Sequence, residues 1–474
     1  MLIRLERVLQ ALVKLMGQKQ RLPSAILDVA GGKVFTYGSY ELGVYGPGSD
    51  IDALMLAPKH VTRENFFEHV PDLLRKEFKA NEMTELTPVP GISVPIIKLE
   101  LCGVPIDLIF CSLRQSSVTA SIDLSDVNVL RGLDDTDLRC INGTRVAKRM
   151  LELVPETKTF RKALRAVKLW AKMHALYGNI VGFPGGVAYA LMVARVCQLY
   201  PRASASRILL KWFGVMRSWQ WPTPLMLAAK EEAALQLREW DPIAYNGDKY
   251  HLLPVLTPSY PRANAIHTIG PSTKKVLMRE MDRANETVNQ IYGGKATWKT
   301  LFQRHNFFTS AYKHYISVVT ASKTKEAQQA WSGLVESRLK WLVQGIERSD
   351  ASAIELVHPY NKGFNRVHEC KTEDDTEKTL HGSLDCQVKD IKTETTEAAA
   401  DPKVQGAAAT DTDGKDIHMP DATVPVNGTG PQIIHSTTFY LGIDLKPGML
   451  PFTGVMSTAD VVTQAPTHST SRTL

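Results

Sequence analysis

The chain has 474 residues, of which 44% are hydrophobic, so it is too long for one ordinary core and apolar enough to fold into two to four domains. Its formal net charge of +7 is uneven, because residues 366–433 carry 14 acidic and 7 basic side chains and leave +14 on the rest. A basic body suits a polyanionic partner, although charge alone is equally compatible with a basic protein that binds none.

Neither the cysteines nor the apolar runs indicate secretion or membrane insertion. The N-terminal residues 1–16 carry leucine or methionine at helical spacing with charges between them, which predicts an amphipathic helix and not a signal peptide. No apolar run is long enough to span a bilayer. The six cysteines form no closely spaced pair and are typical of a reduced compartment. We therefore expect a soluble intracellular protein with no membrane partner.

Residues 1–150 predict a small α/β domain. Residues 34–37 and 51–56 are β-rich runs flanked by glycines, and residues 65–79 have the apolar stripe of a helix. Residues 94–101 and 104–110 are two further strands, which the tight turn Cys102-Gly103 joins into a hairpin.

The rest of the chain predicts a helical domain over 151–303 and a mixed α+β domain over 304–474. Helical patterns cover 160–177, 187–200 and 204–217, and a strand is expected at 437–445. Between residues 366 and 433 the chain has no aromatic residue and is rich in Thr, Ala, Asp and Glu. That composition predicts a disordered acidic insert in the third domain.

Two aspartates follow a glycine-rich stretch, and a third interrupts an apolar strand. Asp50 and Asp52 are two positions apart, so on a strand their side chains project from the same face. Like charges this close repel unless a cation lies between them, and carboxylate oxygens are the ligands that Mg²⁺ prefers. Asp107 lies in the run Val-Pro-Ile-Asp-Leu-Ile-Phe, where an unpaired carboxylate is costly. An Asp-x-Asp pair is usually a solvated strand face, but the third carboxylate favours a catalytic site that holds two metal ions.

Gly38 and Ser39 come shortly before Asp50 and Asp52, with the glycine-rich stretch between them. Gly38 lets the backbone approach a phosphate, and the amide and hydroxyl of Ser39 can donate to phosphate oxygens. A lone Gly-Ser is weak evidence, but Gly-Ser at this distance before Asp-x-Asp indicates nucleotidyl transfer.

The predicted helix that starts near residue 160 carries a basic face. Arg161, Arg165, Lys168 and Lys172 recur at intervals of three or four residues. A solvated basic face would give the same pattern, whereas the alternative interpretation assigns at least Lys168 to a triphosphate. We predict that His174 is a packed histidine and not a ligand.

A glycine-rich loop at 182–187 opens the next helix, where free amides can bind an anion. Tyr177 and Asn179 lie just before this loop, and a tyrosine ring can stack on a base while an asparagine amide can pair with adenine. A plain connecting loop remains an equal alternative when this segment is considered alone.

Several runs resemble the eukaryotic nuclear poly(A) polymerases, members of the DNA polymerase beta-like nucleotidyltransferase superfamily. They are Phe35-Thr-Tyr-Gly-Ser-Tyr-Glu-Leu-Gly-Val-Tyr-Gly-Pro-Gly-Ser-Asp-Ile-Asp-Ala-Leu, Val94-Pro-Ile-Ile-Lys-Leu, Ile106-Asp-Leu-Ile-Phe, Leu164-Arg-Ala-Val-Lys-Leu-Trp-Ala-Lys, Ala194-Arg-Val-Cys-Gln-Leu-Tyr-Pro, Phe307-Phe-Thr-Ser-Ala-Tyr-Lys-His-Tyr and Trp331-Ser-Gly-Leu-Val-Glu-Ser. The resemblance is continuous from about residue 2 to residue 363.

The resemblance implies three domains: a nucleotidyltransferase (polymerase beta-like) domain at 1–150, a helical central domain at 151–303 and an RRM-like RNA-binding domain at 304–474. The disordered insert at 366–433 would interrupt the third domain, whose C-terminus we expect to be incomplete. Family members carry residues before the point where this chain begins, and those residues help build the central domain. We also expect the N-terminal helix of this chain to pack on the central domain.

The resemblance also implies an activity and its residues. The activity is addition of AMP from ATP to the 3′ end of pre-mRNA, with release of pyrophosphate, in a cleft between the first two domains. Two Mg²⁺ or Mn²⁺ ions would serve as cofactors. The catalytic and metal-binding residues would be Asp50, Asp52 and Asp107, and the same carboxylates would contact ATP together with Tyr37, Gly38, Ser39, Lys168, Tyr177, Asn179, Gly186 and Val187. The family usually has Phe where this chain has Tyr37.

Partners and location follow from the same resemblance. We expect RNA 3′ ends, ATP and the cleavage and polyadenylation factors as partners, a monomeric state, and a nuclear location. Two other functions stay open. The chain could be an RNA-binding protein whose truncated ends impair catalysis, or a related RNA nucleotidyltransferase that adds uridine or CCA.

Overall fold

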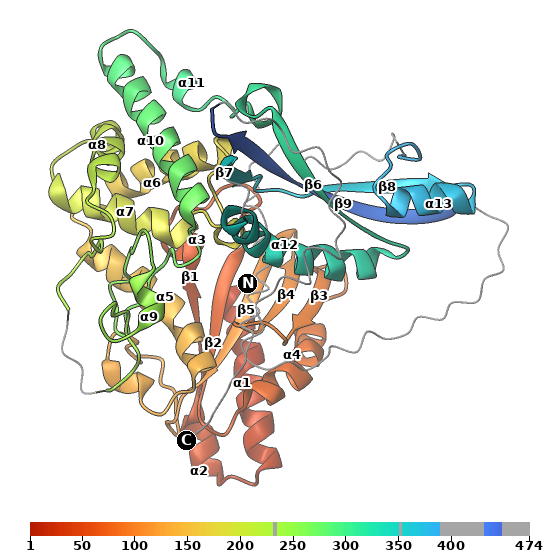
Figure 1. The fold of residues 1–474 in the computed structure, drawn as a ribbon. Coiled ribbons are helices and arrows are strands. Elements are labelled where there is room, and N and C mark those ends of the chain that lie inside the picture. Colours follow the sequence, from red (N-terminus) through yellow and green to blue (C-terminus); the bar gives the residue numbers. More distant parts are fainter. Residues whose placement is uncertain (231–234, 350–352, 389–430, 448–474) are drawn as a thin grey trace, which may run out of the picture.

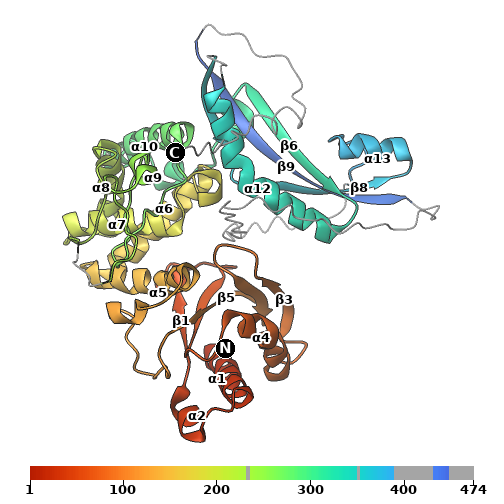
Figure 2. The ribbon, with the colours of Figure 1, turned by 60° about the horizontal axis from the view of Figure 1, so that its bottom comes forward.

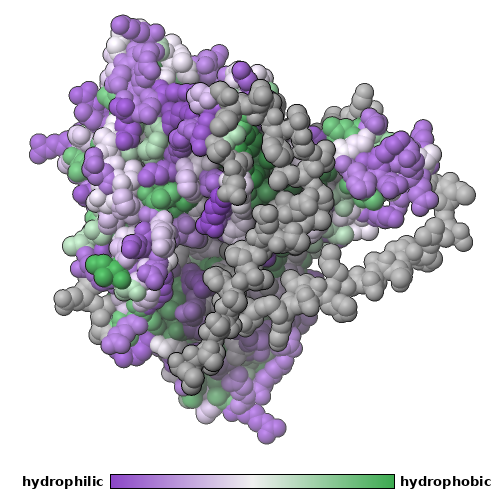
Figure 3. Space-filling model, in the orientation of Figure 1, coloured by the Kyte–Doolittle hydropathy of each residue, from purple (hydrophilic) through white to green (hydrophobic). Residues whose placement is uncertain are grey.

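The computed structural model describes residues 1–230, 235–349, 353–388 and 431–447. They form three domains (Figures 1 and 2). The first is a sheet domain, the second is a helical domain beside it, and the third is another sheet domain that also borders the helical domain. On the face shown in Figure 3, the outer surface around α8, α10 and α11 is mostly hydrophilic. None of the described helices combines the length and the apolarity that crossing a bilayer requires.

The first domain is a five-stranded sheet with helices on both faces. The strand order is β1-β2-β5-β4-β3, in which β2 and β5 run parallel and the other pairs antiparallel. Its elements are α1 (Leu2–Lys19), α2 (Ser24–Ala30), β1 (Lys33–Tyr37), α3 (Gly38–Glu41), β2 (Ile51–Ala57), α4 (Arg63–Glu77), β3 (Met83–Val89), β4 (Ile96–Leu101), β5 (Val104–Ser112), η1 (Val127–Leu130) and the start of α5 (Asp135–Leu153).

Alternation along β2 and β5 gives the sheet two differently covered faces. Ala53, Met55 and Leu108 lie in a core with α1 and α4, whereas Leu54 and Ile109 belong to a second core with α5. Alternate side chains of a strand project to the same face, so Asp52 lies on the face of Leu54 and Asp107 lies on the face of Ile109. The carboxylates therefore lie on the face that α5 covers, at the end of the strands where the apolar cover stops.

The N-terminal helix does not pack on the central domain, so that expectation was wrong. The stripe Leu5, Leu9 and Leu12 of α1 is buried against α4 and the first face of the sheet. The apolar stripe of α1 and the apolar first face of the sheet cover each other, and this packing removes both surfaces from water.

The hairpin between β4 and β5 is as predicted, while β3 was not foreseen. Cys102 and Gly103 both have positive φ, at 52° and 76°, which suits the predicted two-residue turn. β3 is an edge strand with the sequence Met-Thr-Glu-Leu-Thr-Pro-Val and is mostly exposed. Polar residues and a proline suit an edge strand, so no apolar run marks it in the sequence.

The second domain is a bundle of helices around a core that contains Trp170, Tyr189, Trp212 and Phe213. Its elements are the end of α5, α6 (Thr157–Met173), η2 (Asn179–Val181), α7 (Gly186–Leu199), α8 (Ala205–Ser218), α9 (Asn246–Lys249), α10 (Pro271–Tyr292) and α11 (Trp298–Leu301). The three helices predicted from periodicity correspond to α6, α7 and α8. Helix α10 was not predicted, although Val276, Leu277 and Met281 of this helix reach the core.

The third domain is a four-stranded sheet built around its last strand. β9 (Gln432–Leu445) pairs antiparallel with β6 (His314–Ser322), β7 (Ile354–Pro359) and β8 (Phe364–Cys370). The helix α12 (Lys325–Arg348) packs on one face of this sheet (Figure 2). The remaining elements are η3 (Phe307–Ala311) and α13 (Glu373–Leu380).

The predicted insert at 366–433 is wrong at both of its ends. Residues 366–370 belong to β8, 373–380 form α13, and β9 already begins at Gln432. Thr372 and Asp375 form a capping box that starts α13, and Cys370 and Thr379 are buried where this helix meets the sheet. Main-chain pairing and capping order this polar segment without aromatic residues. Residues 389–430, the rest of the predicted insert, and the tail at 448–474 lie outside the described residues.

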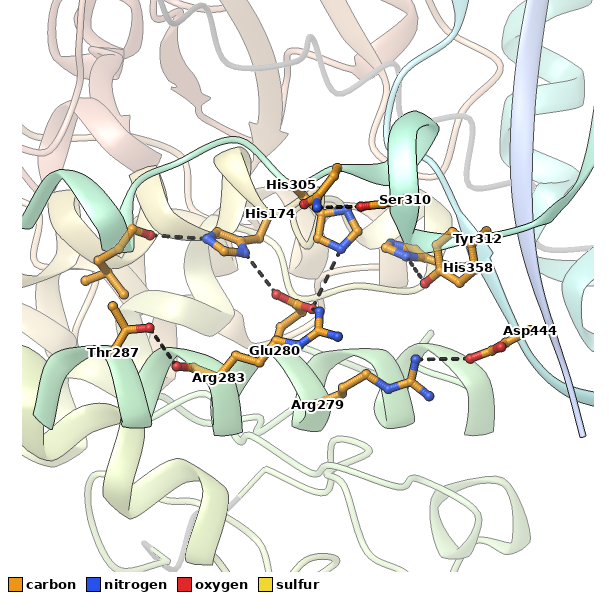
Figure 4. A network of polar contacts seen from close by, with 12 residues as sticks. His174, Arg279, Glu280, Arg283, Thr287, His305, Ser310, Tyr312, His358 and Asp444 are labelled. Atoms are coloured by element: carbon orange, nitrogen blue, oxygen red, sulfur yellow. Dashed lines mark hydrogen bonds and ion pairs between the residues drawn. The ribbon is translucent and has the colours of Figure 1, made fainter. Parts of the chain in front are cut away.

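A buried polar network joins the second and third domains (Figure 4). Glu280 on α10 accepts hydrogen bonds from His174 at 2.9 Å and contacts His305 at 3.7 Å. Burial opposes ionisation of Glu280, yet the hydrogen bond from His174 and the nearby His305 and Arg283 outweigh it and hold the pKa of this carboxyl well below its usual range. His174 is thus a packed histidine, as predicted. Beside it, Tyr312 bonds to Nδ1 of the fully buried His358 at 2.7 Å.

Candidate active site

The register of the first sheet lines up four polar side chains in one row across four strands. Tyr37 on β1 lies opposite Asp52 on β2, Asp52 is beside Asp107 on β5, and Asp107 is opposite Lys98 on β4. Residues in register share a face of the sheet. The register thus brings together two of the three predicted carboxylates and adds the cation Lys98, which was not predicted as a site residue.

Asp50 completes a cluster that could hold a divalent cation. It lies just before β2, and one carboxylate oxygen from each of Asp50, Asp52 and Asp107 lies within 4.8 Å of the others. All three side chains are half-buried. Three hard oxygen donors this close, open to solvent on one side, fit a divalent ion that keeps water or phosphate in its remaining positions. The residues present therefore fit the metal that the carboxylates imply.

Gly38 and Ser39 lie directly against this cluster. Gly38 has a φ of 64°, and a Cβ at this position would overlap the Asp52 carboxylate. Ser39 is in the first turn of α3, and its Oγ is buried without a hydrogen-bond partner among the described residues. An orphaned hydroxyl beside three carboxylates is the kind of group that a phosphate oxygen would satisfy.

Tyr37 forms the wall of the cluster on the β1 side. Its ring lies against α5, where a Cβ on Gly143 would come within 2.9 Å of it. Burial, and then the nearby charges of Asp52 and Asp107, hold the pKa of the Tyr37 hydroxyl well above its usual range. This hydroxyl therefore stays protonated and can act only as a neutral hydrogen-bonding group at physiological pH.

Helix α6 holds the loop that follows α3. The Nε of Arg161 donates to the carbonyl of Leu42 at 2.8 Å, and Arg165 donates to the carbonyl of Gly43 at 2.7 Å. Two residues of the predicted basic face thus bind the main chain and are not simply solvated. Lys168, on the next turn, is buried, with 7% of its surface exposed. This burial shows that Lys168 is not part of a solvated basic face.

Tyr177 and Asn179 lie between α6 and α7. The Tyr177 ring stacks on Tyr189 with centroids 5.9 Å apart, and its hydroxyl lies so near α7 that a Cβ on Gly186 would come within 2.7 Å of it. Asn179 Oδ1 accepts a hydrogen bond from the Thr268 hydroxyl at 2.6 Å. This bond fixes the orientation of the Asn179 amide and so the direction in which its Nδ2 group donates. The Asn361 side chain donates to the carbonyl of Tyr177 at 3.4 Å, so the third domain also contacts this segment.

The structure thus places the predicted residues in two groups on two domains. One group surrounds the three carboxylates, and the other comprises Lys168, Tyr177, Asn179 and the start of α7, where Gly186 is half-buried and Val187 is exposed. The contacts from α6 to the loop after α3 connect them. Thr268 and Asn361 were missed, because a lone threonine or asparagine in a loop carries no sequence signal. Lys98 could have been predicted, because a two-residue turn at Cys102-Gly103 pairs it with Asp107.

Comparison with known families gives three matches that follow one another along the chain. The Poly(A) polymerase nucleotidyltransferase domain matches residues 1–154, the Poly(A) polymerase central domain matches 159–304, and the Poly(A) polymerase predicted RNA binding domain matches 306–454.

Curated poly(A) polymerases are similar to most of the chain. Poly(A) polymerase pla1 of Schizosaccharomyces pombe is 44% identical over 93% of this chain and 76% of its own length. Poly(A) polymerase PAPalpha of Candida albicans is 47% identical over 76% of this chain and 64% of its own length. A solved structure of the RNA terminal uridylyl transferase Cid1 matches 63% of this chain and 90% of its own chain, with 15% identity and a TM-score of 0.41.

Proposed function

This chain belongs to the poly(A) polymerase family, and we propose that Asp50, Asp52 and Asp107 catalyse its transfer of AMP from ATP to the 3′-hydroxyl of pre-mRNA. It is a polynucleotide adenylyltransferase whose partners are RNA and nucleotide and whose carboxylate cluster suits a divalent metal. The single observation that carries the assignment of the site is the convergence of three carboxylate oxygens within 4.8 Å of one another.

The proposed reaction is an in-line attack of the RNA 3′-hydroxyl on the α-phosphate of ATP. A bond forms between the 3′-oxygen and the α-phosphorus, the bond to the β-phosphate oxygen breaks, and pyrophosphate leaves. Two Mg²⁺ or Mn²⁺ ions bound by the carboxylates would lower the pKa of the hydroxyl and neutralise the departing phosphates. The hydroxyl of Ser39 and the ammonium of Lys168 bind triphosphate oxygens.

Selection of adenine falls to the segment between α6 and α7. The ring of Tyr177 stacks on the base, and the Nδ2 group of Asn179 donates to a ring nitrogen of adenine. The amides of Gly186 and Val187, at the N-terminus of α7, bind the triphosphate. The support for this arrangement is the hydrogen bond from Thr268 that directs Asn179 and the packing of Tyr177 against Gly186.

Replacing one carboxylate tests the proposal. We expect Asp107→Ala to abolish AMP incorporation into an oligo(A) primer while ATP still binds, because the nucleotide contacts on the second domain remain. The matched control is Asp28→Ala, which removes an exposed carboxylate on α2 of the same domain. Incorporation by purified Asp107→Ala at the rate of the control would refute the assignment. Extension with each of the four nucleotides in turn tests the preference for ATP.

The same family relationship supports a location and partners. We propose that the chain acts in the nucleus as a monomer and is recruited by cleavage and polyadenylation factors. Microscopy of the tagged chain tests the location, and light scattering of the purified protein tests the monomer. Affinity capture of the tagged chain tests recruitment, which fails if no such factor is recovered above a mock purification.

A further inference from the structure

A groove on the second domain is lined by cations and by no acid. It has a volume of about 880 Å³ and lies where the end of α7, the loop after it, the N-terminal half of α8 and the last residue of α10 meet. Three of its lining side chains are cations, and no aspartate or glutamate is among the described residues that line it. We call this surface, whose charged residues are Arg202, Arg207 and Lys211, the basic groove.

The basic groove is separate from the proposed nucleotide site. Gly186 begins α7 at the nucleotide site, whereas Leu199 ends α7 at the groove. The 14 residues of this helix place the two ends about 21 Å apart at the usual rise per residue. The cations of the groove therefore have no part in the proposed binding of the triphosphate.

Aromatic rings, and not carboxylates, hold two of the three cations in place. The Arg207 guanidinium lies 6.0 Å from the centroid of the Tyr292 ring, and the Lys211 ammonium lies 5.4 Å from that of Tyr200. Within the part of the chain that the structure describes, neither these two cations nor Arg202 forms an ion pair. A ring orients a cation without neutralising it. An anion that binds here thus meets charges that are already ordered, which lowers the entropic cost of binding.

The rings have little free surface for stacking nucleic-acid bases. Each of the two tyrosines has a cation over its ring. Tyr200 also packs against the core of the second domain, and the Tyr292 ring meets Trp298 with centroids 6.4 Å apart. Binding of single-stranded nucleic acid depends on open ring faces as well as on cations. The groove therefore suits an anion that carries no base.

The edge of the groove is apolar. Leu199 is 46% exposed there, and Pro201 beside it is also exposed. Apolar side chains next to unpaired cations complement a peptide in which acidic and apolar residues alternate. The volume of the groove far exceeds that of a single carboxylate, so several residues of such a peptide fit.

We propose that the basic groove binds an acidic segment of a partner protein. Carboxylates of that segment pair with Arg202, Arg207 and Lys211, and one of its apolar side chains packs on Leu199. The inference goes beyond the proposed AMP transfer, because no step of that reaction involves the groove. A partner held at this end of α7 stays bound while nucleotides are added at the other end.

The test is binding of a short labelled peptide, made of glutamate pairs separated by leucines, to the full chain by fluorescence anisotropy. We expect Arg207→Gln and Lys211→Gln each to weaken binding about threefold, within the range for one partly exposed ion pair. The double variant should lose about tenfold if the two effects add. Lys211→Arg should keep the affinity, and a peptide with glutamine in place of glutamate should not bind.

Tyr292→Leu separates the orientation of the cations from their charge. It keeps apolar bulk at the end of α10 and leaves all three cations in place, but it removes the ring that orients Arg207. We expect it to weaken binding of the peptide about twofold to threefold, within the range for an exposed cation–ring contact. Tyr292 is 42% exposed, so the melting temperature should stay unchanged.

Lys249→Gln is the matched control, since it removes an exposed cation of α9 in the same domain and changes the net charge equally. An equal loss in this control would overturn the proposal, as would full affinity in the double variant or no binding of the glutamate peptide to the unaltered chain. If the double variant lost affinity for oligo(A) as strongly as for the peptide, the groove would bind nucleic acid and the proposal would be wrong. These outcomes are separate from that of Asp107→Ala, because peptide binding is measured without ATP.

Discussion

At Gly38 the site has no room for a side chain, because the main chain turns with a positive φ against the Asp52 carboxylate. We expect Gly38→Ala to lower the rate of AMP incorporation at least about a hundredfold, since a Cβ there must displace a carboxylate that needs a fixed position. Gly46→Ala is the control in the loop that follows α3, as a Cβ there meets nothing within 4 Å. Equal rates for the two variants would show that the position of Asp52 does not limit the reaction.

Under the proposed role of Asn179, Thr268 acts on the base only through its hydrogen bond to Asn179. Thr268→Val keeps the shape but removes the hydroxyl that donates to Oδ1, so the amide of Asn179 is free to rotate. We expect the ratio of ATP to GTP incorporation to fall about tenfold, in line with one misplaced base contact. Thr268→Ser, which retains the hydroxyl, should keep the ratio of the unaltered chain. An unchanged ratio in Thr268→Val would remove this threonine from nucleotide selection.

Helix α6 connects the two halves of the site. Arg161 and Arg165 bind the carbonyls of the loop after α3, and Lys168 follows on the same helix. Arg161→Ala should therefore raise KM for ATP and lower kcat by about tenfold, because a looser loop misplaces Ser39. Lys162→Ala removes an exposed cation from the same helix and should leave both constants unchanged. The same loss in both variants would indicate a general effect of charge.

The elements differ in how far their sequences reveal them. β2, β5, α6 and α7 carry long apolar periodicities, because each is buried against a core. β3, β8 and α13 are polar and partly exposed, and pairing with a neighbour or a capping box orders them. The partner of β8 is β9, which lies far along the chain, so a local pattern could not predict that strand.

Across the whole molecule, the junction between the second and third domains should respond to pH. Burial, helped by the nearby His305, lowers the pKa of His358 to about 3 from its ordinary 6.5, with Glu280 and Arg279 acting in opposite directions. Below pH 6.5 an unfolded chain protonates this histidine, while the folded chain does not until about pH 3. The free energy of unfolding should fall across that window by about 1.4 kcal/mol per pH unit.

Thermal unfolding at mildly acidic and neutral pH checks this expectation. His358→Gln keeps a partner for Tyr312 but cannot take up a proton, so its melting temperature should depend less on pH than that of the unaltered chain. All other histidines are common to both proteins, and the difference therefore isolates His358. If the melting temperatures of both proteins changed equally with pH, burial at the junction would not be keeping His358 unprotonated.

The sequence by itself determined the chemistry and the order of the domains. Glycine before Asp-x-Asp, a carboxylate in an apolar strand and a glycine-led helix are local patterns, and each follows from what phosphates and cations require. The tertiary structure decided which distant residues meet: α1 against the first sheet, Thr268 on Asn179, Lys98 opposite Asp107 and Arg207 over the Tyr292 ring. These contacts depend on register and packing between elements far apart in the chain, which no local spacing specifies.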